Sequence, residues 1–275
     1  MKKEYSEIFN LCFPQFHMSH ERFCSLLEKE KSTYFDFEEN GQVAGFAIVD
    51  DYAIRLLCVA PQMQRKGIGT KLLADIEENL ASKGYEKCLT GGVSSKMFIG
   101  AVEESWGFFE KNGYKSVGGC EEMLIRLKDF PKGDYVLHGH EIAEYGWFQG
   151  DMEEIRAAVA AVDESWVQYY TNPSNIYVGR VNGEIASFCQ VDLNAQNYLT
   201  DAYGKVGMPG CVGTVPKFRN KGVALEMIAN VTGYLKEKNM DISFIFYTGV
   251  ARWYEKLGYE TFLTEVFGVK ELTNK

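Results

Sequence analysis

The sequence predicts an α/β (α+β) protein made of two tandem domains, each a mixed β-sheet with flanking helices. Two repeated features carry this prediction. A glycine-containing loop follows an apolar run and precedes an amphipathic segment at Pro61–Gly69, and the same arrangement recurs at Pro216–Ala224. A short aromatic segment that ends in glycine and tyrosine, Trp106–Tyr114, recurs at Arg252–Tyr259. Two features repeated in the same order indicate an internal duplication.

The segments that follow the two loops have their apolar residues at matching distances from the loop glycine. This spacing places the apolar side chains on one face of a helix. The matching residues are Ile68, Leu72, Leu73, Ile76 and Leu80 after Gly67, and Val223, Met227, Ile228, Val231 and Leu235 after Gly222.

The other elements follow from periodicity and from turn residues such as Asn40-Gly41. In the first domain we expect helices near 4–13, 19–30, 67–82 and 103–112, and strands at 33–38, 43–50, 52–59, 86–90, 114–118 and 122–128. In the second we expect a strand near 135–147, a helix over 151–170, and strands at 175–181, 184–192 and 206–215 before the repeated features. The best linker is Phe130–Asp134, which contains proline and glycine. The predicted domains are therefore residues 1–132 and 133–275.

Each repeated loop has the chemistry of a phosphate site. Unpaired backbone N–H groups at a helix start, together with the positive end of the helix dipole, attract an anion. Gly67 and Gly222 allow backbone dihedrals that a β-carbon resists. One such loop alone would more often be a simple strand-to-helix turn, but its duplication favours phosphate binding.

The loop and the aromatic helix together resemble the GCN5-related N-acetyltransferase (GNAT) family, and the resemblance covers most of the chain twice. In that family the pyrophosphate of an acyl-CoA lies on the loop, and the preceding strand binds the pantetheine arm through its backbone. The resemblance therefore implies acetyl-CoA as cofactor, with both loops as candidate binding sites; whether both domains bind it stays open. The implied contacts are Leu57, Cys58, Val59, Gln64, Arg65, Lys66, Gly67, Ile68, Gly69 and Thr70 in the first domain, and Val212, Gly213, Thr214, Val215, Arg219, Asn220, Lys221, Gly222, Val223 and Ala224 in the second.

The resemblance also implies a catalytic residue. A tyrosine of the aromatic helix commonly donates a proton to the departing thiolate in this family, and it corresponds here to Tyr254 in the second domain and to Phe109 in the first. Because phenylalanine cannot donate a proton, we expect the chemistry in the second domain. The general base stays open, with Asp192, Asp163 and Glu164 as candidates by sequence position only.

The chain departs from the family pattern in its first domain. That domain begins with a helix, so the usual opening strand is missing or supplied by another part of the chain. Residues 91–103 form an insertion between the loop and the aromatic helix. The insertion is either a substrate-side loop or a surface connection.

These features favour an N-acyltransferase that moves an acetyl or other short acyl group from coenzyme A to an amine on a small molecule or peptide. The alternative is a non-catalytic module that binds acyl-CoA as a sensor. A dinucleotide-binding oxidoreductase is disfavoured, because Gly67-Ile-Gly69 lacks the third glycine of that motif.

The composition of the chain argues against some kinds of binding partner and favours one cellular compartment. A net charge of −9 argues against nucleic acid. No apolar run approaches the roughly 20 residues that cross a bilayer, and Met-Lys-Lys is followed by Glu4 and Tyr5 rather than a signal core. Seven widely spaced cysteines suit a reducing compartment, so we expect a cytoplasmic protein without membrane contact. The histidine pairs lack supporting ligands, so we expect no metal site. The acceptor and the oligomeric state have no signal in the sequence.

Overall fold

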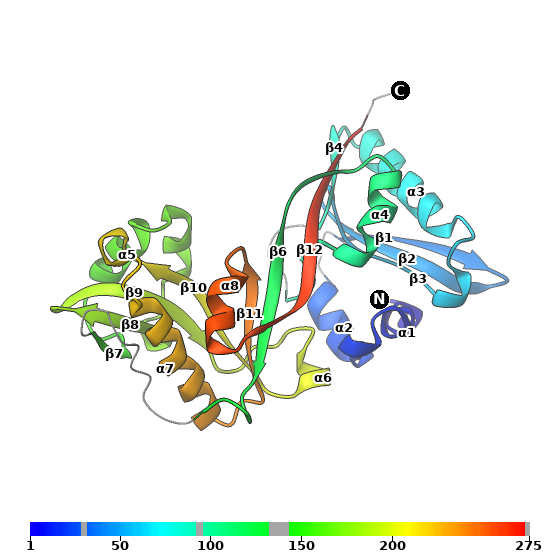
Figure 1. The fold of residues 1–275 in the computed structure, drawn as a ribbon. Coiled ribbons are helices and arrows are strands. Elements are labelled where there is room, and N and C mark those ends of the chain that lie inside the picture. The colour runs from blue at the N-terminus through cyan, green and yellow to red at the C-terminus, as the bar shows by residue number, and fades with distance from the viewer. Residues whose placement is uncertain (29–31, 92–95, 132–142, 273–275) are drawn as a thin grey trace. The chain divides into compact units, whose positions relative to one another are not determined.

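The computed structural model describes residues 1–28, 32–91, 96–131 and 143–272, and the chain divides into two compact units (Figure 1). The first unit contains Met1–Glu121, Gln196–Ala202 and Leu263–Lys275, and the second contains Glu122–Ala195 and Tyr203–Phe262. Each unit has a mixed sheet flanked by helices, which confirms the predicted fold class. The predicted boundary between residues 132 and 133 and most of the predicted linker lie outside the described residues.

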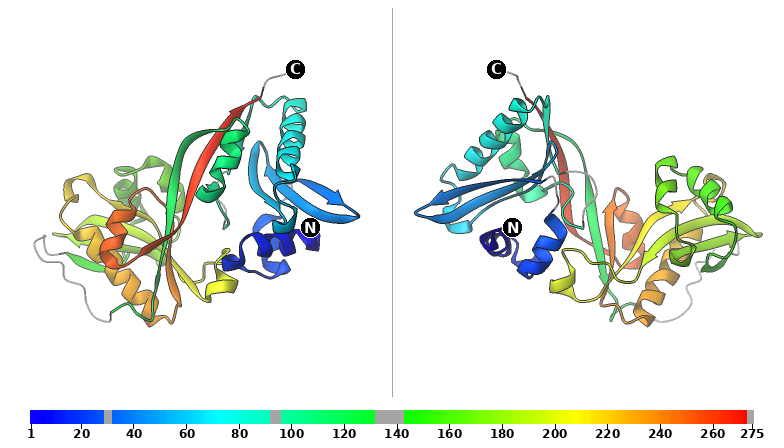
Figure 2. Two further views of the ribbon diagram at one scale, coloured as in Figure 1. Left: turned by 45° about the vertical axis from the view of Figure 1, so that its right-hand side comes forward. Right: turned by 180° about the vertical axis from the view of Figure 1, so that it is seen from behind.

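The first unit begins with two helices and three antiparallel strands. These are α1 (Lys3–Cys12), α2 (His20–Leu27), β1 (Ser32–Glu39), β2 (Gln42–Asp50) and β3 (Ala53–Val59). Next come α3 (Ile68–Ser82), β4 (Lys87–Thr90), β5 (Ala101–Val102) and α4 (Glu103–Lys111). Helices α1 and α2 cover one face of β1–β3 and α3 covers the other (Figure 2).

The sheet of the first unit is completed by the last strand of the chain. Strand β12 (Glu260–Glu271) pairs antiparallel with β4, with Gly268 opposite Thr90, and it also pairs with β5. The strand order in this unit is β1-β2-β3-β4-β12-β6, where residues 115–121 of β6 (Lys115–Arg126) belong to the unit. The chain thus supplies a strand to this sheet from another part of the sequence, but this strand lies beside β4 and not beside β1.

The second unit repeats the arrangement of the first. Its elements are β7 (Glu144–Trp147), α5 (Met152–Ala160), β8 (Ile176–Val181), β9 (Glu184–Asp192), β10 (Val206–Thr214), α7 (Val223–Glu237), β11 (Ile242–Thr248) and α8 (Ala251–Tyr254). Its strand order is β7-β8-β9-β10-β11-β6. Helix α6 (Thr200–Tyr203) lies in the connection between β9 and β10.

The two strands expected at 114–118 and 122–128 form one strand, β6 (Lys115–Arg126). The expectation was wrong because the chain stays extended through Gly118-Gly119, between the two expected strands. A β-carbon on Gly119 would lie 2.4 Å from the carbonyl oxygen of Glu265 on β12. Glycine is therefore required here by the close approach of a neighbouring strand, and not by a change of chain direction.

The helix expected over 151–170 is also interrupted. Helix α5 ends at Ala160, and the 3-10 helix η3 (Glu164–Tyr169) begins after Asp163. Asp163 has extended backbone dihedrals, and its Oδ1 accepts hydrogen bonds from the backbone N–H and the hydroxyl of Ser165. A new cap inside the apolar pattern therefore starts a second helix. The strand expected near 135–147 is seen only as β7, since residues 132–142 are outside the described part.

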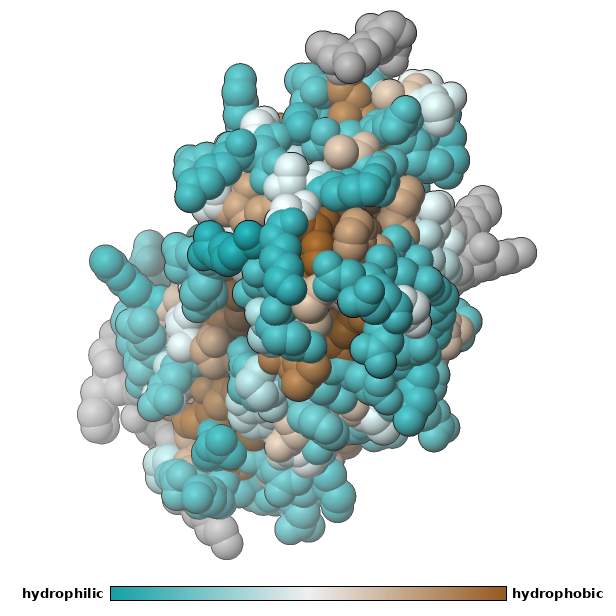
Figure 3. All heavy atoms as spheres, turned by 90° about the vertical axis from the view of Figure 1, so that its right-hand side faces the viewer, coloured by the Kyte–Doolittle hydropathy of each residue, from teal (hydrophilic) through white to brown (hydrophobic). Residues whose placement is uncertain are grey.

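The predicted apolar faces of α3 and α7 are buried. All five matching side chains of each helix are 4% exposed or less, and they pack on the sheet of their own unit. Burial of each such side chain contributes about 1.5–3 kcal/mol. The face shown in Figure 3 is mostly hydrophilic with separate apolar patches, which is ordinary for a folded protein.

Candidate functional site

The two repeated loops have the same backbone conformation. Arg65 and Asn220 have φ values of 61° and 62°, and Gly67 and Gly222 have φ values of 82° and 79°. Each loop begins with a short 3-10 helix after the strand, and the long helix begins directly after the glycine. The left-handed conformation explains why glycine occupies positions 67 and 222, since most other residues are strained in it.

A further hydrogen bond is shared by the loops. The side chain of Gln64 donates to the backbone oxygen of Val59 (3.0 Å), and Arg219 Nε donates to the backbone oxygen of Thr214 (3.2 Å). Each bond ties the loop to the end of its strand. The first-turn N–H groups of α3 and α7 have no acceptor within their own helix, so both loops present amides suited to a phosphate.

The strand before each loop separates from its parallel neighbour. The ladder between β3 and β4 contains the pairs Ala53↔Leu89 and Ile54↔Thr90, and the ladder between β10 and β11 contains two pairs at Val206 and Gly207. The later residues of β3 and β10 are outside these ladders. Their backbone groups can therefore bond an extended ligand as another strand would.

In the first unit this opening is a cavity of about 690 Å³. Strand β3, the loop and helix α4 form its walls. Eight of the predicted cofactor residues line it, namely Leu57, Val59, Gln64, Arg65, Gly67, Ile68, Gly69 and Thr70. Lys66 does not line it, and Cys58 is buried on the opposite side of the strand, where Cys12 lies.

A smaller cavity of about 50 Å³ continues the first one along β3. Leu57, Ser105 and Phe109 line both cavities. Other walls of the small cavity come from Ile54, Arg55 and Phe98. Phe109, the residue that corresponds to Tyr254, thus lies where the two cavities meet.

The predicted cofactor residues of the second unit lie at the end of β10, in the loop and at the start of α7. Val212, Gly213 and Thr214 end the strand, Val215 and Arg219–Gly222 form the turn, and Val223 and Ala224 begin the helix. Lys217 and Lys221 place their ammonium groups over the ring of Phe218. This unit therefore brings its predicted residues together in the same order as the first.

Tyr254 is 5% exposed at the end of α8, against 7% for Phe109. Its ring packs edge-on against Trp253 and Tyr259. Burial raises the pKa of Tyr254 above its ordinary value, so the hydroxyl stays protonated at neutral pH. That is the form that a proton donor needs.

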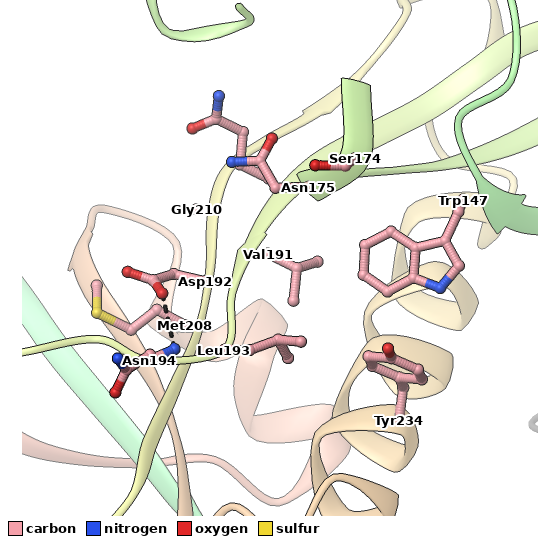
Figure 4. Close-up of a pocket in the computed structure, with 11 residues that line it drawn as sticks. Trp147, Ser174, Asn175, Val191, Asp192, Leu193, Asn194, Met208, Gly210 and Tyr234 are labelled. Carbon is pink, nitrogen blue, oxygen red and sulfur yellow. Dashed lines mark hydrogen bonds between the residues drawn. The ribbon is translucent and has the colours of Figure 1, made fainter. Parts of the chain in front are cut away.

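A third cavity, of about 890 Å³, lies in the second unit and is drawn in Figure 4. Trp147 and Tyr234 line one side of it, and Asp192 and Asn194 the other. Of the three candidate bases, Asp192 lines this cavity, and its Oδ1 accepts the N–H of Asn194 (2.8 Å). Asp163 caps η3 instead.

The sequence did not predict a role for two charged residues of the first unit, Glu265 and Arg55. Glu265 of β12 is fully buried and accepts hydrogen bonds from the backbone N–H of Ile99 (3.0 Å) and the thiol of Cys120 (3.7 Å). Burial raises the pKa of Glu265 to about 7. Arg55 is 3% exposed, and its Nε lies 3.5 Å from Asp50 Oδ2. They belong to distant segments and carry no local motif, so no sequence signal could have found them.

Glu265→Gln should raise the thermal unfolding temperature at pH 8 and leave it nearly unchanged at pH 5. The folded-state pKa lies above the ordinary value of 4.5, so the folded carboxyl binds its proton more tightly and the wild type loses stability as pH rises from about 4.5 through 7. A neutral amide removes this loss. Thermal scans at both pH values measure it, with the exposed Glu110→Gln as control. A variant that loses more stability at pH 8 than at pH 5 would contradict the expectation.

No group of three or more potential metal ligands occurs within residues 1–28, 32–91, 96–131 and 143–272. In the same ranges, every helix is too short or too polar to cross a membrane.

Comparison with known families identifies the duplicated unit. A model of the GNAT acetyltransferase domain matches residues 2–123, and a second GNAT model matches residues 141–262. The chain belongs to the GNAT acetyltransferase family. As a tandem member it is a transferase that moves an acyl group from coenzyme A to an amine.

One relative of this GNAT protein is the ribosomal protein bS18 alanine N-acetyltransferase of Escherichia coli. It is 30% identical over 104 residues, which are 35% of this chain and 70% of the relative.

Solved structures share the fold across nearly the whole chain. A glucosamine N-acetyltransferase region of a fungal multi-domain β-N-acetylglucosaminidase has a TM-score of 0.76 at 18% identity, and the match covers 97% of this chain and 36% of that one. A GCN5-related N-acetyltransferase from Sphaerobacter thermophilus has a TM-score of 0.71 at 17% identity, with 97% and 91% covered. A tandem GNAT protein of the clavulanic acid pathway has a TM-score of 0.62 at 12% identity, with 99% and 95% covered. At these identities the likeness is one of fold.

Proposed function

We propose that both loops bind acetyl-CoA and that the second unit transfers its acetyl group to an amine. One observation carries this proposal. Phe109 lies where the loop cavity of the first unit meets the smaller cavity along β3. In a cofactor held by the loop and by β3, that junction is where the thioester arrives. From the repeat we infer that Tyr254 takes the corresponding point of the second unit, where it adds a hydroxyl.

The chemistry follows from that placement. A protonated acceptor first gives up its ammonium proton to solvent. The neutral amine nitrogen then attacks the thioester carbonyl, the carbon–sulfur bond breaks, and the Tyr254 hydroxyl donates its proton to the departing thiolate. The phenolate then regains a proton from solvent or from the amine product. The first unit binds the same cofactor without this donor.

Release of free coenzyme A thiol from acetyl-CoA in the presence of an amine panel tests the function. We expect release that depends on the amine. If the protein binds acetyl-CoA but no amine gives release above hydrolysis, the sensing alternative replaces the enzyme. Seven free cysteines also favour a reducing compartment, and on that ground we propose the cytoplasm.

We propose that the acceptor enters the 890 Å³ cavity of the second unit. Its aromatic side chains, Trp147 and Tyr234, and the carboxylate of Asp192 suit a protonated amine. Gly210 also lines it and pairs with Gln190 directly before the β-bulge of β10, two residues before the first predicted cofactor residue, Val212. The alanine N-acetyltransferase activity of the relative favours a peptide α-amine or a small-molecule amine of similar charge.

Asp192→Asn should raise KM for a cationic amine about tenfold and change acetyl-CoA affinity little, because an amide keeps the shape but loses the charge. Steady-state kinetics with the best amine of the panel measures the change. Asp163→Asn, on the same unit but in the cap of η3, is the control. Equal KM in wild type and Asp192→Asn would show that the acceptor does not bind in this cavity.

A further inference from the structure

A buried arginine lines the small cavity of the first unit. Arg55 lines it and is 3% exposed. The residue sits in a β-bulge of β3, because Ile54 pairs with Val49 and Leu56 with Ile48, which leaves Arg55 as the extra residue between them. A bulge redirects one side chain locally. Here Arg55 lines a cavity whose other lining residues are mostly apolar, among them Ile54, Phe98 and Phe109.

This arginine lies at the end of the cofactor path. The path starts at the loop, passes Val59 and Leu57 in the large cavity, and reaches Arg55 in the small one. Four residues of strand span about 13 Å. An acyl-CoA bound by its pyrophosphate at Gly67 and by its pantetheine arm on β3 therefore directs its acyl end toward Arg55.

We propose that the first unit binds an acyl-CoA whose acyl group ends in a carboxylate, with that carboxylate on Arg55. The proposal rests on the cofactor site proposed above. The volume fits a short diacid: about 50 Å³ has room for a few water-sized groups, each needing about 10–15 Å³, which suits a malonyl group and excludes a long chain.

The chemistry of Arg55 permits it to bind the ligand carboxylate in addition to the carboxylate of Asp50. Arginine has five N–H donors in a planar fork and stays charged in proteins. Its Nε faces Asp50, and a guanidinium of this kind can serve two carboxylates at once. The repeat supplies a contrast, since the residue corresponding to Arg55 in the second unit is Gly210. The two units of one chain therefore differ in the acyl group that they prefer.

The charges around Arg55 predict that the preference for malonyl-CoA depends on pH. Asp50 on β2 and Glu265 on β12 interact electrostatically with Arg55, and Cys120 on β6 donates to Glu265. A ligand carboxylate favours the neutral form of Glu265, whose pKa is about 7. The preference for malonyl-CoA over acetyl-CoA should therefore be largest near pH 6 and fall as pH rises through 7.

Calorimetric titration of the full chain carrying Gly222→Val tests the proposal. This substitution should weaken cofactor binding at the second loop, so that the titration reports on the first unit. The probes are coenzyme A, acetyl-CoA and malonyl-CoA at pH 6.5. We expect malonyl-CoA to bind at least about tenfold more tightly than acetyl-CoA, as a charge-assisted hydrogen bond in a buried site provides. Arg55→Met should abolish this difference and leave affinity for coenzyme A unchanged, whereas Arg65→Met in the loop should weaken all three probes alike.

Binding of coenzyme A reports that Arg55→Met is folded, and Arg55→Lys provides a second variant that should keep part of the preference. Equal affinity for malonyl-CoA and acetyl-CoA in the parent protein would overturn the inference while the cofactor site stands. Failure of all three probes to bind would overturn the cofactor site and the inference together. A last titration adds free malonate to the complex with coenzyme A. If the binding free energy of malonate equals the gain of malonyl-CoA over coenzyme A, the site binds a separate carboxylate and the acyl-chain proposal is wrong.

Discussion

Tyr254→Phe should lower kcat about 100-fold or more, the usual contribution of a positioned general acid. The substitution removes one hydroxyl and keeps the ring that packs against Trp253 and Tyr259. In the proposed mechanism the hydroxyl acts on the departing thiolate and not on bound acetyl-CoA, so kcat and kcat/KM should fall together. The first unit already carries this change at Phe109, which is why the same substitution should leave the fold intact.

Steady-state kinetics and calorimetry measure the two sides of this prediction. Calorimetry should give nearly the same acetyl-CoA affinity for Tyr254→Phe and wild type. The matched control is Tyr259→Phe, since the Tyr259 hydroxyl hydrogen-bonds Thr232 (2.8 Å) and Ser243 (2.7 Å) inside the same core. We expect the control to lose stability and to keep most of its rate. Normal turnover by Tyr254→Phe, with activity abolished by changes in the first loop, would move the active site to the first unit.

The loops and the helices after them could be predicted because their determinants are local. A left-handed glycine at the helix start and apolar residues on one helix face leave a pattern within about fifteen residues, and the duplication supplied it twice. The structure adds a shared detail, the Gln64 and Arg219 side-chain bonds to their strands. Different residue types make these two bonds, so the sequence alone did not suggest them.

Features made by distant segments could not be predicted. Strand β12 pairs with β4, although more than 150 residues separate Thr90 from Gly268. The break expected between residues 118 and 122 was wrong for the same reason, because the glycine at position 119 accommodates the carbonyl of Glu265 on a distant strand. The Arg55 and Glu265 pair also depends on this strand pairing. A single sequence carries periodicity and turn chemistry, but it does not show which strand lies beside which.

Replacing the loop glycines by valine should weaken acetyl-CoA binding about tenfold or more at the altered site. Both residues have left-handed φ values, 82° for Gly67 and 79° for Gly222, which a β-branched residue resists. A valine forces the loop to rearrange, and the amides at the helix start then no longer converge on one phosphate. If both loops bind, each single variant should reduce the number of tight sites measured by calorimetry from two to one.

The chain offers two controls for backbone strain alone. Gly84, after α3, and Gly183, between β8 and β9, have φ values of 86° and 82°, and neither belongs to a loop site. At these two glycines and at Gly67, an added β-carbon would have no protein atom within 4 Å. All four valine variants should therefore lose similar stability in thermal unfolding, while only Gly67→Val and Gly222→Val lose cofactor affinity. Unchanged affinity in both loop variants would mean that the pyrophosphate lies elsewhere, because a ligand held by those amides cannot be indifferent to their rearrangement.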